Sequence, residues 1–350
     1  MQPGRPLGPR CRRLDGPLRD TTVTLSAGGA SYRRHLNFVF PETVLLAVEV
    51  TIVGLLTVSG ASLFGEGSMT GYRWLTGQDA HPSLRARIEG VAHLRCDFFS
   101  EELSLSTSMT VILPQATATQ VGMVGRTAAG LRPVLYLLHG LSDDDTTWLR
   151  RTSIERYVAS LGVAVVMPQV HRSFYTDEAV GGRYWSFLSE ELPALVSTFF
   201  RVSERRSDTF VAGLSMGGYG ALKWALRQPE RFAAAASLSG ALNISGLRSQ
   251  RPRPEDPGLF DRVFGAEPVG GQDDVMGLIE RADVGRLPAL YICCGTEDAL
   301  LEDNLAFRDA CARAKIPLSV DIGPGGHEWS YWDARIQDVL EWLPLSGDAG

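Results

Sequence analysis

The chain has 350 residues, of which 44% are hydrophobic and 21% are charged, so it can bury the core of one large or two modest domains. Its 37 glycines and 19 prolines are too few for a low-complexity or collagen-like chain, which excludes disorder as the main state. A net charge of -6 gives no basic field to neutralise a phosphate backbone. Nucleic acid is therefore not an expected partner.

The cysteines form an odd set without a Cys-x-x-Cys spacing: Cys11, Cys96, Cys293, Cys294 and Cys311. This pattern favours neither a disulfide framework nor a zinc site. Two of the cysteines are adjacent in an apolar run, where small buried thiols are typical. We therefore expect reduced cysteines in the interior and no bound metal.

Residues 1–90 differ from the rest of the chain and have three interpretations. Their apolar stretch at residues 43–65 is interrupted by Glu49, and the uncharged part is shorter than the roughly 18 residues of a membrane-spanning helix. A secretory signal would have a shorter leading region. We favour the third interpretation, in which translation begins near Val91 and the protein is cytoplasmic. If residues 1–90 are genuine, the protein is membrane-anchored or secreted instead.

From residue 109 onward, short apolar runs alternate with helix-length segments, which is typical of a mostly parallel α/β sheet. Strands are predicted at residues 109–113, 134–138, 163–167, 210–212, 233–238, 289–294 and 318–322, and helices at 153–161, 190–200, 217–228, 304–314 and 331–342. We expect residues 91–350 to form one domain, with helices flanking a sheet of roughly six to eight strands.

The alternation breaks at residues 243–287, which are rich in Arg, Pro, Gly and Asp. A long insertion in a compact domain is usually functional. We expect a small cap, with Phe260 and Phe264 at helical spacing on its inner face.

One motif predicts a nucleophile. Gly213-Leu214-Ser215-Met216-Gly217 is the chain's Gly-x-Ser-x-Gly, and it lies between a predicted strand and a predicted helix. This chemistry needs a serine on a tight strand-to-helix turn, with glycines that let the strand and helix approach closely. We predict Ser215 as the nucleophile.

A serine hydroxyl needs a base to take its proton and an acid to orient that base, in the chain order Ser, Asp or Glu, His for this arrangement. His327 is the one histidine C-terminal to Ser215, so it is the predicted base. The acid follows the strand at residues 289–294, where Glu297, Asp298, Glu302 and Asp303 compete. We choose Asp298, because it lies at the turn after the strand.

Acyl transfer also needs two N–H donors for the oxyanion. One is the amide after the nucleophile, that of Met216, and the other comes from a loop after an earlier strand. His139-Gly140-Leu141 follows the strand at residues 134–138, so we assign the second donor to Leu141. We expect His139 to hold that loop by packing and hydrogen bonding.

Aromatic residues cluster at 174–175 and 184–187. Most such residues are part of a core, but the loop that carries them opens at the same edge as the predicted nucleophile. We expect some of them, Tyr175 and Trp185 among them, to line an apolar acyl pocket together with Phe260 from the insertion.

Seven segments together resemble one family. They are Leu137-Leu138-His139-Gly140-Leu141-Ser142, Ser173-Phe174-Tyr175-Thr176-Asp177, Tyr184-Trp185, Glu190-Glu191-Leu192-Pro193, Gly213-Leu214-Ser215-Met216-Gly217-Gly218-Tyr219-Gly220-Ala221, Cys294-Gly295-Thr296-Glu297-Asp298 and Gly325-Gly326-His327-Glu328-Trp329. This combination, between about residues 96 and 345, resembles the esterase D-like family of esterases, especially its bacterial tributyrin esterase and S-formylglutathione hydrolase branch.

The resemblance implies an α/β-hydrolase fold, with Ser215, Asp298 and His327 as catalytic residues and the amides of Leu141 and Met216 at the oxyanion. It also implies a short-chain carboxylic ester or a thioester such as S-formylglutathione as substrate. Some members of the family deacetylate sugars, and related mycolyltransferases pass acyl groups to carbohydrate.

We predict a serine carboxylesterase that works through an acyl-enzyme and needs no metal or organic cofactor. Two alternatives stay open. One is a secreted or membrane-anchored acyltransferase or deacetylase that acts on acyl esters of carbohydrates, and the other is a non-catalytic binding protein. The expected partner is a small-molecule ester or thioester, and the sequence leaves the oligomeric state open, a homo-oligomer included.

Overall fold

The computed structural model describes residues 21–27, 30–36, 90–115, 130–250, 256–267 and 269–345. The chain divides into two units, Met1–Asp79 and Ala80–Gly350. In the first unit, β1 (Thr21–Ala27) and β2 (Ala30–Leu36) pair as an antiparallel hairpin, which is absent from the predicted elements. The apolar stretch at residues 43–65 lies outside the described residues. Within those residues, no helix has the length and apolarity to cross a membrane.

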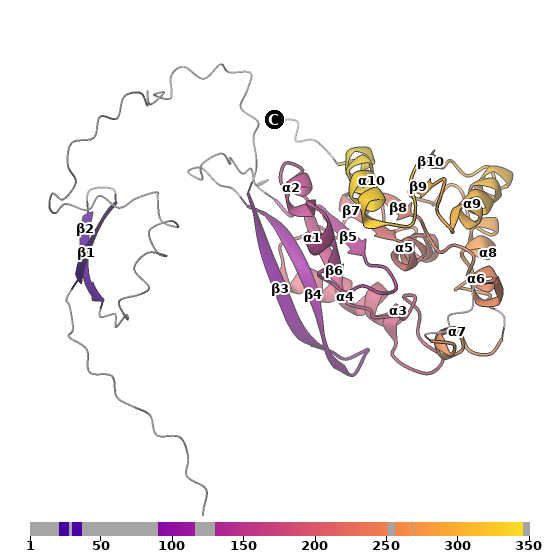
Figure 1. Ribbon diagram of the computed structural model, residues 1–350, viewed down its shortest axis with the longest axis horizontal. Coiled ribbons are helices and arrows are strands. Elements are labelled where there is room, and N and C mark those ends of the chain that lie inside the picture. The colour runs from indigo at the N-terminus through magenta and orange to yellow at the C-terminus, as the bar shows by residue number, and fades with distance from the viewer. Residues whose placement is uncertain are drawn as a thin grey trace, which may run out of the picture. The chain divides into compact units, whose positions relative to one another are not determined.

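The second unit contains an eight-stranded sheet with the strand order β10-β9-β8-β7-β5-β6-β4-β3 (Figure 1). Its strands are β3 (Gly90–Ser100), β4 (Leu105–Gln115), β5 (Val134–Leu138), β6 (Ala164–Pro168), β7 (Thr209–Leu214), β8 (Ala234–Leu238), β9 (Ala289–Gly295) and β10 (Ser319–Gly323). The six strands from β5 to β10 pair in parallel, whereas β4 pairs antiparallel with both β6 and β3. The predicted mostly parallel sheet is therefore confirmed.

Helices cover both faces of this sheet. On one face lie α1 (Thr147–Arg151), α2 (Ile154–Val158) and α10 (Trp329–Trp342), and on the other lie α4 (Leu192–Phe199), α5 (Met216–Arg227) and α9 (Leu301–Arg313). The central position of β5 explains why its sequence is apolar throughout. Leu135 and Leu137 belong to the core under α10, whereas Tyr136 and Leu138 belong to the core under α5, as expected for a strand covered on both sides.

The strand order explains which loops come together. After β5 the chain first forms β6 on one side and later β7 on the other, so the order reverses at β5. Leu138 at the end of β5 pairs with Gly213 at the end of β7, and Gly295 of β9 pairs with Gly323 of β10. The loops that follow these strands emerge at the carboxyl edge of the sheet, where open α/β sheets bind their ligands.

The predicted insertion at residues 243–287 contains three short helices, α6 (Ile244–Gln250), α7 (Leu259–Phe264) and α8 (Val275–Glu280); residues 251–255 and 268 lie outside the described part. The rings of Phe260 and Phe264 pack around Phe174 at centroid distances of 5.6 and 5.5 Å. The amides of Ala179 and Val180 donate to carbonyls of α7, each at 2.9 Å. These contacts fasten the insertion to the loop that follows β6.

Candidate active site

Ser215 occupies the turn between β7 and α5 with φ 55° and ψ -116°. Residues other than glycine rarely adopt this backbone conformation. Close backbone packing at two glycines holds Ser215 in this turn. A Cβ at Gly213 would meet the backbone of Gly217, and a Cβ at Gly217 would meet the carbonyl groups of Leu138 and His139. Both glycines of the motif are therefore required by packing.

The structure brings the three predicted catalytic side chains together. His327 Nε2 lies 3.0 Å from Ser215 Oγ, and His327 Nδ1 lies 2.9 and 3.1 Å from the two carboxylate oxygens of Asp298. A serine is activated by this kind of contact, in which a base within hydrogen-bond reach is itself oriented by an acid.

Asp298 is buried, and its side chain has no exposed surface. Burial by itself raises the pKa of this carboxyl group. Hydrogen bonds from His327 and from the Leu300 amide, the latter at 2.8 Å, oppose that effect and hold the pKa below its usual value. Asp298 is therefore an ionised carboxylate at neutral pH, as an acid that orients an imidazole must be.

Two residues without a sequence signal support this pair. The ring of Trp332 packs edge-on against His327 at a centroid distance of 4.8 Å, and its indole N–H donates to Ser239 Oγ at 3.2 Å. The Ser239 hydroxyl also lowers the pKa of the Asp298 carboxyl group. These contacts restrict the orientation of both the base and the acid.

Hydrogen bonds from both backbone and side-chain atoms join the loop that carries the acid to the loop that carries the base. Glu297 Oε2 accepts a hydrogen bond from the Gly325 amide at 2.6 Å, and the Glu297 amide donates to the Gly325 carbonyl at 3.0 Å. The Thr296 amide donates to the Gly323 carbonyl at 2.8 Å. Glu297, one of the competing acids, thus holds the histidine loop instead of contacting the imidazole.

The other two competing acids, Glu302 and Asp303, lie in the first turn of α9. Negative side chains stabilise that end of a helix. Their place there agrees with the choice of Asp298 as the predicted acid.

The predicted oxyanion donors lie on adjacent loops. Met216 is the first residue of α5, so its N–H has no partner within the helix. Leu141 follows β5, which pairs in parallel with the strand that leads to Ser215. The Asp143 carboxylate accepts a hydrogen bond from the Gly140 amide at 3.2 Å and so fixes the turn that carries Leu141.

His139 has the contacts of a structural residue. The Val170 amide donates to its Nε2 at 3.2 Å, which leaves Nδ1 as the protonated nitrogen that donates to the Gly140 carbonyl at 2.7 Å. Burial lowers the pKa of this histidine, so the ring is neutral. It ties the loop after β5 to the loop after β6.

The three residues that were predicted to line the acyl pocket are buried in the core instead. Tyr175 has no exposed surface, and its hydroxyl donates to the His139 carbonyl at 2.8 Å. It therefore supports, from within the core, the loop His139-Gly140-Leu141 that carries a predicted oxyanion donor, which we call the oxyanion loop. Trp185 is 8% exposed, and the guanidinium of Arg227 lies over its ring at 3.6 Å. Phe260 is also 8% exposed and packs inside the aromatic cluster of α7.

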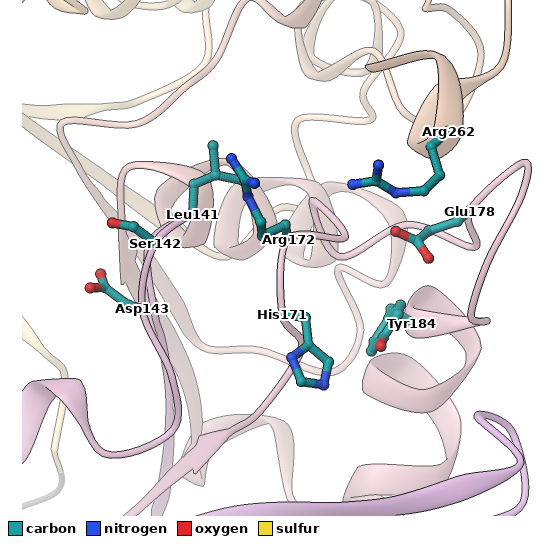
Figure 2. A pocket seen from close by; sticks show the side chains of 8 residues that line it. All are labelled: Leu141, Ser142, Asp143, His171, Arg172, Glu178, Tyr184 and Arg262. Carbon is teal, nitrogen blue, oxygen red and sulfur yellow. The ribbon is translucent and has the colours of Figure 1, made fainter. Parts of the chain in front are cut away.

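A cavity of about 430 Å³ begins at the oxyanion loop. Its lining comes from that loop, the segment after β6 and α7: Leu141, Ser142, Asp143, His171, Arg172, Glu178, Tyr184 and Arg262 (Figure 2). Most of these side chains are polar or charged. The cavity therefore differs from the expected apolar acyl pocket: of the aromatic cluster at residues 174–175 and 184–187, Tyr184 lines it, whereas Tyr175 and Trp185 do not.

No cluster of His, Cys, Asp and Glu that could hold a metal ion is present among the residues that the structure describes. In the same part of the chain, Cys96, Cys293, Cys294 and Cys311 are free thiols. Burial raises the pKa of Cys311 to about 12, so this thiol stays protonated and unreactive.

Comparison with known proteins identifies the family. Residues 100–343 match the family model described as "Putative esterase". The chain belongs to this esterase family. The match confirms the resemblance inferred from the sequence motifs.

Individual relatives agree with this assignment. An acetyl esterase of Caldicellulosiruptor saccharolyticus is 29% identical over 267 residues, which are 74% of this chain and 100% of the relative. The fluorophosphonate-binding serine hydrolase F of Staphylococcus aureus is 34% identical, with a TM-score of 0.65 over 73% of this chain and 99% of that structure. The S-formylglutathione hydrolase of the same organism is 33% identical, with a TM-score of 0.64 over 73% and 100% of the two chains. The chain is thus a serine ester hydrolase with the α/β-hydrolase fold.

Proposed function

We propose that this esterase hydrolyses short-chain carboxylic esters or thioesters through an acyl-enzyme formed on Ser215. The observation that carries the proposal is the continuous hydrogen-bonded chain from Asp298 through His327 to Ser215, with distances of 2.9 and 3.0 Å. A half-buried serine on a strained turn, a partly exposed imidazole and a buried carboxylate have the properties that their three roles demand.

In the first half of the reaction, Ser215 Oγ attacks the ester carbonyl carbon while His327 Nε2 takes the hydroxyl proton. The carbonyl electrons move to the oxygen, and the amides of Leu141 and Met216 donate to that oxyanion. Asp298 stabilises the imidazolium that has formed. When the intermediate collapses, the bond to the alcohol or thiol breaks, and His327 returns the proton to this leaving group.

In the second half, water attacks the acyl-serine carbonyl, and His327 takes a proton from that water. Collapse of the second intermediate releases the carboxylic acid and returns the proton to Ser215 Oγ. Every proton that leaves a nucleophile is thus returned to a leaving group, so the cycle needs no further reactant.

The relatives support both proposed substrate classes. One is named for acetyl esters and another for the thioester S-formylglutathione. Acetyl and formyl groups are both small, which favours a short acyl chain for this protein as well.

The first prediction tests the nucleophile. Ser215→Ala lowers kcat by about 10³-fold or more, because only the binding and oxyanion contributions remain. The assay compares kcat/KM on p-nitrophenyl acetate, butyrate and octanoate, and on S-formylglutathione, for the wild type and the variant. A fluorophosphonate probe labels the wild type and not the variant.

Ser197→Ala is the matched control, because Ser197 lies on α4, outside the catalytic loops and the cavity lining. It keeps probe labelling at Ser215. If Ser215→Ala retains full activity, another residue is the nucleophile. A thioester rate that exceeds the ester rates by orders of magnitude assigns the protein to thioester hydrolysis.

A further inference from the structure

Two arginines from separate segments converge in the cavity beside the oxyanion loop. Arg172 follows β6, whereas Arg262 comes from α7 of the insertion. Both guanidinium groups bind the carboxylate of Asp256, Arg172 at 3.0 Å and Arg262 at 3.3 Å. Figure 2 shows the two side chains entering the same space from different parts of the fold. We call this cavity the arginine pocket.

The arginine pocket has more cationic donors than its own carboxylates use. Each guanidinium carries several N–H donors in a planar fork, and the two share the carboxylate of Asp256. The two acids in the lining are held by backbone amides: Glu178 accepts from the Gly182 amide at 2.9 Å, and Asp143 accepts from the amide of Gly140. Arg172 and Arg262 both line the cavity, and each guanidinium has N–H donors beyond those that bind Asp256.

The position of the arginine pocket connects it with the reaction. Leu141 both lines the cavity and carries an amide that we assign to the oxyanion. An ester carbonyl held by this amide would have one of its two substituents at the mouth of the cavity. A volume of about 430 Å³ is within the range of small-molecule sites.

We propose that Arg172 and Arg262 determine specificity by binding a carboxylate on the ester or thioester substrate, an inference that rests on the proposed function. A planar carboxylate matches the guanidinium fork and can accept two parallel hydrogen bonds from it. The carboxylate belongs either to the leaving group or to the acyl group, and the experiment separates these two sources.

The test uses pairs of substrates that differ in charge. For the leaving group the pair is meta-acetoxybenzoate and meta-acetoxybenzamide; for the acyl group it is the mono-p-nitrophenyl ester of glutarate and p-nitrophenyl butyrate. In one of the two pairs, the wild type prefers the anionic member by about tenfold in kcat/KM. Arg172→Gln and Arg262→Gln each lower that preference severalfold while kcat/KM for the neutral member is kept.

Two controls separate this inference from a general loss of structure. Arg308→Gln, an exposed arginine on α9 outside the pocket lining, leaves the charge preference unchanged. Arg262→Lys keeps the charge and restores part of the preference. Inhibitors measure the same preference in the wild type alone. The inhibition constant of meta-hydroxybenzoate is compared with that of meta-hydroxybenzamide, and the inhibition constant of glutarate with that of glutaramide.

The outcomes distinguish the two proposals. If the neutral esters are hydrolysed but the wild type shows no charge preference in either pair and no preference between the inhibitors, the arginine pocket does not bind a carboxylate and the esterase function stands. The same conclusion follows if both glutamine variants keep the full preference. If no ester or thioester is hydrolysed at all, the proposed function fails and the inference fails with it.

Discussion

Burial decides which carboxylate can serve the imidazole of His327. Asp298 and Glu297 are neighbours in the sequence with the same charge. The Asp298 side chain has no exposed surface and contacts Nδ1, whereas Glu297 is exposed and its carboxylate accepts from the Gly325 amide. An ion pair weakens in water, so the buried acid is the one that can stabilise an imidazolium during the reaction.

Asp298→Asn therefore lowers kcat by about 10³- to 10⁴-fold on p-nitrophenyl acetate, because an amide cannot stabilise the imidazolium and orients the wrong tautomer. Glu297→Gln is the matched control and retains far more activity. Circular dichroism checks that both variants fold. If the two substitutions have equal effects, or if Glu297→Gln is the more damaging, the assignment of the acid is wrong.

At the scale of elements, the strands and turns that depend on a local sequence pattern were predicted from the sequence. The apolar run of β5 was predicted at its observed bounds, and the Gly-x-Ser-x-Gly motif at Ser215 was placed correctly between β7 and α5. The hydrogen bonds between the loop after β9 and the loop after β10 join backbone atoms far apart in sequence, so no local pattern encodes them. Tyr175 was misplaced for the same reason, because its packing against Gly220 depends on two distant segments.

The joined loops give a prediction for Glu297 as a positioning residue. Glu297→Ala removes the acceptor of the Gly325 amide, so His327 samples less productive orientations. We expect kcat to fall by about 10-fold, within the range for displaced catalytic groups, while KM changes little. Glu302→Ala, at the start of α9, is the control, and Glu297→Gln restores part of the rate. A change in KM alone, or an equal loss in the control, would contradict this role.

At the scale of the whole catalytic domain, a buried lysine joins three parts of the fold. Lys223 of α5 has no exposed surface, and its ammonium donates to Thr176 Oγ1 at 2.6 Å and to Asp273 Oδ1 at 3.0 Å. Thr176 belongs to the segment after β6, and Asp273 belongs to the insertion. The Tyr219 hydroxyl, also on α5, donates to the Asp273 carbonyl at 2.7 Å. The helix that begins directly after Ser215 therefore anchors the insertion.

The last prediction concerns the pH dependence of stability. Burial lowers the pKa of Lys223 from 10.5 to about 8, although Asp273 and Asp177 oppose this effect and Arg227 adds to it. Between these two pH values the unfolded chain binds more protons at this lysine than the folded chain does. The contribution of Lys223 to the free energy of unfolding therefore rises from pH 8 to pH 10.5 and is lost as the pH falls through 8.

We expect the stability of the wild type to rise relative to that of Lys223→Met over this interval, as measured by urea unfolding at several pH values. Lys315→Met is the matched control, because Lys315 is the only other lysine in the chain and is exposed. Its stability follows that of the wild type at every pH. If the difference between the wild type and Lys223→Met is constant with pH, Lys223 keeps an ordinary pKa. A difference that falls with pH would show that the ion pair with Asp273 outweighs burial and holds the lysine charged.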